Sequence, residues 1–175
     1  MAALMDHREY FSTLAHYNEW ATERLLCAID ALSDAEYRKD CGLFFKSVHG
    51  TLNHLLIGEH LLWYARFADG TSPKVDLGAE IEVDRQVVRE RLLTLVKRWQ
   101  PLVARFTLEQ FSSTLSYTTT KGVPTTLPFS ATLTHVFNHA THHRGQITAA
   151  LTALGQTCPE LDLVYMLQLE SKMES

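Results

Sequence analysis

The sequence contains no long hydrophobic run, no excess of basic residues and no closely paired cysteines. Its longest wholly apolar runs are a few residues, far short of the roughly 20 that a membrane-spanning helix needs. Lys and Arg total 16 against 20 Asp and Glu, for a formal net charge of −4, so the chain lacks the basic field that binds nucleic acid. The three cysteines, Cys27, Cys41 and Cys158, form no C-x-x-C motif, which favours a reducing compartment over a disulfide framework.

The N-terminus also lacks an apolar core of signal-peptide length, because MAALMDHREYF already carries charges from Asp6 onward. We therefore expect a cytosolic protein that binds neither a membrane nor nucleic acid. With 175 residues, 46% of them hydrophobic and 21% charged, the chain has the composition of an ordinary globular protein. This length predicts a single domain over residues 1–175.

Hydrophobic periodicity predicts an all-α fold with four long helices. The expected helices span about Asp6–Leu32, Ser47–Ala68, Glu82–Phe106 and Ser130–Leu154. The second is apolar on nearly all sides, so we expect it to be the most buried. In the third, Pro101 is expected to kink the helix or end it early. These helices predict a four-helix bundle.

Shorter signals lie between and after the helices. Ser33 and Glu36 have the spacing of a capping box. The stretch Leu115–Leu127, rich in Thr and turning at Lys121-Gly122, predicts a short β-hairpin between the third and fourth helices. In the third helix, Val87, Leu92, Leu95, Val96 and Trp99 are expected on the inner side. The tail after Cys158 is apolar enough to pack back on the bundle.

Histidine is the unusual residue of this chain, with nine copies, four of them between positions 135 and 143. Histidines four apart lie one helical turn apart and can bind one metal ion together. His135 with His139 and His139 with His143 both have this spacing. On a helical wheel His143 lies about 45° and His139 about 85° from the apolar direction, whereas His135 lies beyond about 120°. A bundle builds its metal sites from inward-facing residues, which favours His139 with His143.

A third ligand has to come from another helix, because a catalytic zinc usually has three protein ligands and one open position. The second helix offers His49, His54 and His60. Periodicity does not decide among them, although the small residues Gly50 and Gly58 near His54 leave room for a pocket. The competing interpretation is that these histidines are surface or core residues without a ligand role.

Two other metal motifs are absent from the chain. The sequence has no His-Glu dipeptide, which excludes the H-E-x-x-H metalloprotease motif. It also has no Glu-x-x-His, which excludes the di-iron carboxylate bundle of the same architecture.

Several stretches together resemble the DinB/YfiT-like family of metal-binding four-helix-bundle proteins. They are Thr51-Leu-Asn-His-Leu-Leu56, His139-Ala-Thr-His-His-Arg-Gly-Gln146, Tyr17-Asn-Glu-Trp-Ala21 and Pro159-Glu-Leu-Asp-Leu163, so the resemblance covers essentially the whole chain. It implies an up-down-down-up bundle, commonly a homodimer. It also implies a divalent metal held by three histidines, which correspond here to His54, His139 and His143. His135 and His142 match no ligand position and are expected to be bystanders or pocket edges.

Four neighbouring residues are candidates for contact with the site or its pocket. Asn53 and Asn138 each precede a ligand and could orient an imidazole, or could simply lie on a polar edge. Gln146 lies near the His139 face. Glu59 is a candidate general base, or a partner for a neighbouring Arg or Asn on a buried helix. Arg144 is expected to point away from His139 and pair with a carboxylate elsewhere.

Three neutral histidines leave a metal ion its full charge, and such an ion activates a bound water or thiol as a nucleophile. The leading hypothesis is a metal-dependent thiol S-transferase or hydrolase-like enzyme acting on a small electrophilic substrate. Its cofactors would be a divalent ion, zinc or nickel, and, from the resemblance, a low-molecular-weight thiol. The alternative is a non-catalytic, dimeric metal-binding module of a stress response. The two differ in whether the metal keeps an open position facing a pocket.

Overall fold

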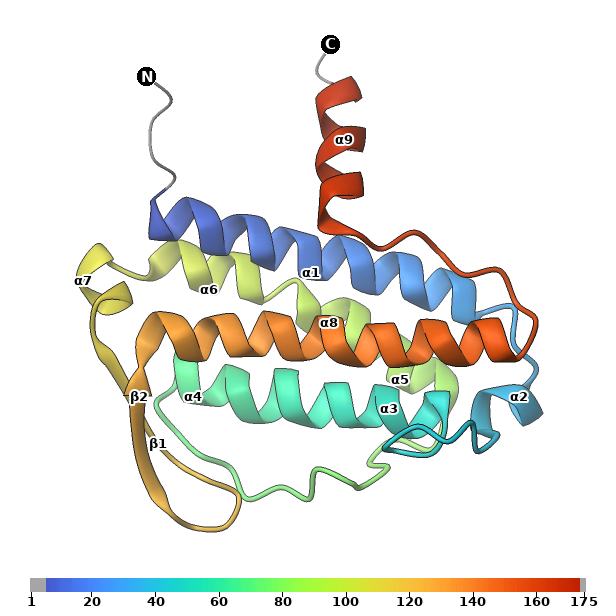
Figure 1. Ribbon diagram of the computed structural model, residues 1–175. Coiled ribbons are helices and arrows are strands. Elements are labelled where there is room, and N and C mark those ends of the chain that lie inside the picture. The colour runs from blue at the N-terminus through green and yellow to red at the C-terminus, as the bar shows by residue number, and fades with distance from the viewer. Residues whose placement is uncertain (1–5, 174–175) are drawn as a thin grey trace.

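The computed structural model describes residues 6–173 (Figure 1). Residues 1–5 and 174–175 lie outside the described residues. The two ends of the predicted domain, and part of the N-terminal stretch in which no signal peptide is expected, therefore fall outside them as well. The long segments are α1 (His7–Ile29), α3 (Val48–Leu55) continued by the π-helical η1 (Leu56–Trp63) and α4 (Tyr64–Ala68), α5 (Arg85–Val96) followed by α6 (Trp99–Arg105), and α8 (Phe129–Ala153). The shorter elements are α2 (Asp34–Arg38), α7 (Leu108–Phe111), β1 (Thr114–Thr118), β2 (Pro124–Pro128) and α9 (Leu163–Met173).

The four long segments lie side by side as a bundle (Figure 1). α1 and α8 run in one direction, and the α3–α4 and α5–α6 segments run in the other, which gives the expected up-down-down-up order. The predicted all-α bundle with a hairpin before its last long helix is therefore confirmed. No helix within residues 6–173 is long and apolar enough to cross a membrane.

Local capping signals set where several helices begin. The carboxylate of Asp6 accepts the backbone N–H of Glu9 at 2.7 Å and starts α1. Ser33 and Glu36 form the predicted capping box of α2. Both contacts satisfy N–H groups that have no partner inside the helix.

The second helical segment is the most buried one, as predicted. Every residue from Val48 to His60 is buried, and the run contains an eight-residue π-helix, η1. A π-helix is rare and often marks a functional site. Here it changes which side chains share a face of the segment, with consequences for the pocket described below.

The third predicted helix forms close to its expected bounds but in two pieces, and one residue of its expected inner face is exposed. It begins at Arg85 rather than Glu82, because the Asp84 side chain caps it, and it is interrupted between Val96 and Trp99. The interruption places Pro101 in the first turn of α6. Proline is tolerated there because backbone N–H groups in the first turn have no acceptor within the helix, so its missing N–H breaks no hydrogen bond. Val87 is exposed, whereas its neighbour Val88 is fully buried.

The hairpin forms where it was predicted and lies against the bundle. Strands β1 and β2 pair antiparallel, and Gly122 supplies the positive φ of 79° that the turn requires. Leu115 of β1 is buried, and the Arg66 side chain on α4 donates to the Thr118 carbonyl at 2.8 Å.

The tail after α8 also packs back on the bundle, as expected. The Tyr17 hydroxyl on α1 donates to the Leu161 carbonyl at 2.8 Å, and Met166 is buried against Tyr17 and Ala21. The sequence did not predict that this tail contains a helix. That helix, α9, projects away from the bundle (Figure 1).

Candidate metal centre

Three histidines from two helices bring their side-chain nitrogens together between α3 and α8. The Nε2 atom of His139 lies 3.3 Å from that of His54 and 3.1 Å from that of His143. One ligand atom from each of the three lies within 4.8 Å of the others. His54 and His143 are buried and His139 is half-buried.

Local sequence explains how these side chains meet. His139 and His143 are one turn apart on α8 and share a face, while His54 faces them from α3. The Phe45 ring stacks on His54 with 3.8 Å between ring centroids. This packing depends on Gly50, because a Cβ at that position would lie only 2.2 Å from the Phe45 carbonyl oxygen.

Hydrogen bonds on the far side of two imidazoles set their tautomers. His54 Nδ1 lies 2.9 Å from the Leu77 carbonyl oxygen, and His143 Nδ1 lies 2.9 Å from Gln146 Oε1. Both oxygens can only accept, so each Nδ1 carries the proton and each Nε2 keeps its lone pair. Such partners behind metal-binding histidines orient the ring and raise its basicity.

The surroundings keep the cluster uncharged at neutral pH. Burial, reinforced by neighbouring histidines, lowers the pKa of His139 to about 3. Burial also lowers the pKa of His143 to about 4, against a raising contribution from the Gln146 hydrogen bond. The pKa of His54 is lowered by the same loss of solvation.

This donor set fits a metal ion. Metal binding requires neutral imidazoles, and three imidazole nitrogens suit zinc, nickel, copper or iron. Since Nε2 of His54 and of His143 both present lone pairs toward His139, the three rings cannot all satisfy one another by hydrogen bonds. A cation between them would satisfy all three.

Of the predicted neighbours, Gln146 alone touches a histidine of the cluster. Asn53 instead accepts the Glu82 N–H at 2.9 Å and donates to the Glu82 carbonyl at 3.1 Å. It thereby ties α3 to the 70–84 segment that carries Leu77. Asn138 is exposed on α8.

Glu59 belongs to a different group of buried polar residues in the bundle interior. Its carboxylate accepts from Asn18 and lies 3.6 Å from His60. Arg144 donates to Asn18 and, at 3.0 Å, to Thr141. Glu59 is therefore the partner of a neighbouring Asn, one of the two roles expected for it, and lies outside the histidine cluster. Arg144 points away from His139, as predicted, and connects to the carboxylate through Asn18.

The remaining candidate histidines lie outside the cluster. His49 is buried beside Glu80 and the Tyr37 ring, and His60 lies next to Glu59. His142 is exposed and contacts Gln146. His135 packs against Trp63 and His139 and forms a pocket edge, one of the two roles expected for it.

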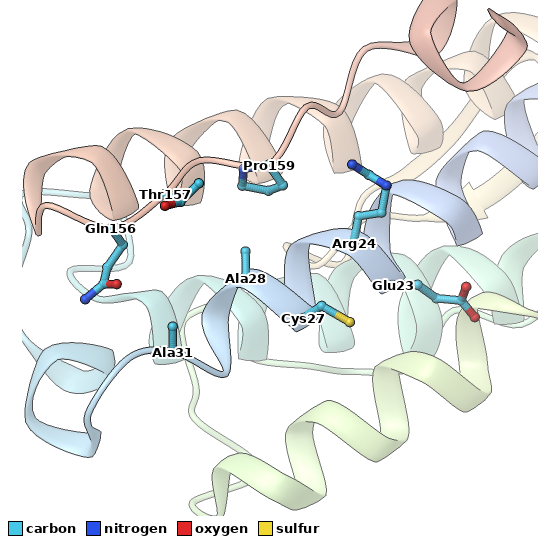
Figure 2. A pocket seen from close by; sticks show the side chains of 8 residues that line it. All are labelled: Glu23, Arg24, Cys27, Ala28, Ala31, Gln156, Thr157 and Pro159. Carbon is cyan, nitrogen blue, oxygen red and sulfur yellow. The ribbon is translucent and has the colours of Figure 1, made fainter. Parts of the chain in front are cut away.

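A cavity of about 250 Å³ opens beside the cluster. His54 and His139 form part of its wall, together with the helical residues Gly58, Leu62, Trp63 and Arg66 and the hairpin residues Tyr117, Thr119 and Thr120. A larger groove, of about 620 Å³, lies elsewhere, between α1 and the segment after α8 (Figure 2). Its walls contain no histidine, so size does not identify the site here.

Sequence reasoning missed Arg66, the Leu77 carbonyl and the hairpin side of this pocket. One signal was present for Arg66: His54, Gly58, Leu62 and Arg66 follow one another at four-residue steps. No local sequence pattern predicts the role of Leu77, because this residue lies in a segment without regular secondary structure.

Fold and site together define the class: a four-helix-bundle protein whose facing helices carry a three-histidine cluster suited to a metal ion. The chain belongs to the DinB family, whose family model matches residues 5–174.

Individual relatives agree with this assignment. The chain is 26% identical to Protein DinB of Bacillus subtilis (strain 168) over 162 residues, which cover 85% of this chain and 88% of that protein. Its fold is similar to that of YfiT from Bacillus subtilis, described as a probable metal-dependent hydrolase with an unusual four-helix bundle topology. That match has a TM-score of 0.69 and 17% identity and covers 90% of this chain and 93% of YfiT. A DinB-like protein from Bacillus cereus ATCC 10987 matches with a TM-score of 0.58 and 17% identity, over 81% of this chain and 90% of that one.

Proposed function

We propose that this protein is a metal-dependent enzyme in which His54, His139 and His143 hold one divalent ion, zinc or nickel. Its substrate would be a small electrophilic molecule, and its reaction hydrolysis or transfer of a low-molecular-weight thiol. The observation that carries this proposal is the convergence of three neutral imidazole nitrogens beside an open cavity. The description of YfiT as a probable metal-dependent hydrolase supports it.

A divalent ion held by three neutral imidazoles makes a water or thiol nucleophilic near neutral pH. The chain's own residues supply the conditions for that chemistry. Leu77 and Gln146 hold two imidazoles in the binding tautomer. Phe45 covers His54 and limits access of water from that side. The cavity gives a substrate access to the side of the cluster formed by His54 and His139.

Hydrolysis and thiol transfer need the same ion and differ in the nucleophile. Support for the hydrolase comes from the description of YfiT, and support for the thiol comes from the family resemblance of the sequence. The two reactions are separated by supplying thiols to the metal-loaded protein and testing whether turnover depends on them.

One observation favours the non-catalytic alternative. Among the described residues that line the cavity, none is Asp or Glu, so no carboxylate is placed there as a general base. His135, whose ring centroid lies 5.4 Å from that of His139, is the histidine outside the cluster that lines the cavity. A stress-response metal module would need no such base. The homodimer, the cytosolic location and the single-domain organisation stay predictions.

Elemental analysis of the untagged protein tests the metal proposal directly. We expect about one metal ion per chain in the wild type and loss of that ion in His54→Ala and His139→Ala. His142→Ala is the matched control, because it removes an exposed histidine from the same helix and should keep the metal. Wild-type protein without metal, or equal metal in all variants, would overturn the proposal.

A further inference from the structure

Arg66 is a buried arginine whose charge has no acidic partner among residues 6–173. Its side chain is 4% exposed, and its guanidinium carbon lies 4.4 Å and 4.2 Å from the ring centroids of Trp63 and Tyr117. One terminal nitrogen donates to the Thr118 carbonyl. The Nε atom is buried and has no hydrogen-bond partner among the described residues. In the part of the chain that the structure describes, no carboxylate forms an ion pair with it.

This arrangement is unfavourable for the protein alone. A buried charge is normally paired, and a buried N–H without an acceptor loses its interaction with water. The two aromatic rings compensate part of the charge by cation–π contact. They carry no full negative charge, so an anion that reaches the guanidinium from the cavity would provide the acidic partner that is missing.

Arg66 lies in the wall of the same cavity as His54 and His139. In an unbroken α-helix, residues twelve apart differ by about 120° around the axis. The π-helical η1 lies between His54 and Arg66, and its wider turns reduce that offset. Gly58 and Leu62 occupy the intermediate turns and also line the cavity. The π-helix therefore brings the arginine and the histidine cluster to one pocket.

The rest of the cavity wall also favours a negatively charged ligand. It contains no carboxylate among the described residues, and the hairpin contributes Thr119 and Thr120, whose hydroxyls can donate hydrogen bonds. An ion held by the three neutral histidines would add further positive charge. A cavity with these walls concentrates anions.

We propose that this pocket binds a small organic anion, with a carboxylate or phosphate group paired to Arg66 and the rest of the molecule beside His54 and His139. This inference rests on the proposed function, since it names the substrate class of that same site. A guanidinium matches either group, because its planar N–H groups can bind two oxygens at once. Arg66 would position the substrate and would not itself react.

The test is calorimetric titration of the protein with succinate and with inorganic phosphate. Succinamide serves as a neutral molecule of the same shape as succinate. We expect succinate or phosphate to bind, and succinamide to bind far more weakly. Arg66→Met should weaken the binding about 10- to 100-fold, the loss typical of a hydrogen bond to a charged group. Preference for one of the two anions identifies the group that the site recognises.

Arg24→Met is the matched control. Arg24 also packs on a tryptophan and a tyrosine, Trp20 and Tyr165. It lies in the other groove, beside Glu23 (Figure 2), so its loss should leave anion binding unchanged. Equal affinity of wild type and Arg66→Met would overturn the inference, as would failure of both anions to bind at millimolar concentration.

Two further measurements separate this inference from the metal proposal. Each titration is repeated after treatment with a chelator, and the metal content of Arg66→Met is measured. If binding is lost on chelator treatment but is the same in wild type and Arg66→Met, the anion coordinates the metal ion alone and the inference is overturned. Binding that depends on Arg66 in protein without metal supports it even if the metal proposal fails. If Arg66→Met does not fold, Arg66→Lys and the comparison of succinate with succinamide decide the question.

Discussion

The Nδ1–H of His54 donates to the backbone carbonyl of Leu77, 2.9 Å away and 23 residues further along the chain. This bond joins the most buried helix to a segment without regular structure and sets the tautomer of a proposed metal ligand. The segment is itself held to α3 by Asn53, through two hydrogen bonds to the backbone of Glu82. The position of one ligand therefore depends on a short loop and on the asparagine that holds it.

Replacing Asn53 should weaken both the fold and the metal site. In Asn53→Ala the Glu82 N–H loses its acceptor, and we expect a loss of about 1–3 kcal/mol in the free energy of unfolding. Metal affinity should fall about tenfold, since the Leu77 carbonyl loses its support. Urea titration and competition with a chelator measure the two effects. Asn138→Ala, at an exposed position of α8, is the control; an equal effect there would contradict the assignment.

Gln146 should act on the metal through His143. In Gln146→Ala the Nδ1–H of His143 loses its acceptor, and we expect metal affinity to fall about 10- to 100-fold. Gln146→Glu keeps an acceptor oxygen and should retain most of the affinity. Chelator competition measures both variants. If the glutamate variant loses as much affinity as the alanine variant, the hydrogen bond is not the cause.

Gly50 should tolerate no side chain, whereas Gly145 should tolerate one. A Cβ at position 50 would meet the Phe45 carbonyl oxygen at 2.2 Å, whereas one at position 145 would have nothing within 4 Å. Gly50→Ala should cost about 1–3 kcal/mol of stability through overpacking. Gly145→Ala lies in an exposed part of α8 and should stabilise the protein by about 0.5–1 kcal/mol. Thermal unfolding of the two variants gives opposite shifts if this account is right.

Acid should destabilise the metal-free protein, partly through His60. Burial lowers the pKa of His60 below its ordinary 6.5, outweighing the raising effect of Glu59 and assisted by Arg98 and Arg144. Below pH 6.5 the unfolded chain therefore binds a proton at His60, whereas the folded chain does not bind it until the pH is lower. The stability present above that pH is lost as the pH falls toward the lowered value, by up to about 1.4 kcal/mol per pH unit for one proton.

His60→Gln should remove this contribution. Urea midpoints of chelator-treated protein between pH 7.5 and 5 measure it, and the variant should lose less stability on acidification than the wild type. Above pH 7 the two should run parallel. His49 and the three cluster histidines His54, His139 and His143 have pKa values shifted in the same direction, so much of the wild-type slope should persist. Identical slopes in both proteins would show that folding does not change the pKa of His60, which would contradict this prediction.

The long helices could be predicted because their signals are local. Apolar periodicity, the Ser33–Glu36 capping box and the turn at Gly122 all act between residues a few positions apart, and each formed as expected. The interruption before Pro101 was harder to place. A proline disfavours the helix before it, but Val88 of α5 and Trp99 of α6 are both fully buried, and core packing of this kind is not readable from a local pattern.

The site likewise has a part that local sequence predicts and a part that only tertiary packing determines. The sequence alone determined that His139 and His143 share one face of α8, because residues four apart are always one turn apart. It did not separate His54 from His49 and His60 without the family resemblance. Tertiary structure decided that, since the helix–helix packing turns His54 toward α8 while His49 and His60 meet Glu80 and Glu59. The same holds for Arg66 and Leu77. The four-residue steps from His54 to Arg66 hint at a shared face, but the π-helix that brings the two together and the loop that carries Leu77 depend on contacts between distant parts of the chain.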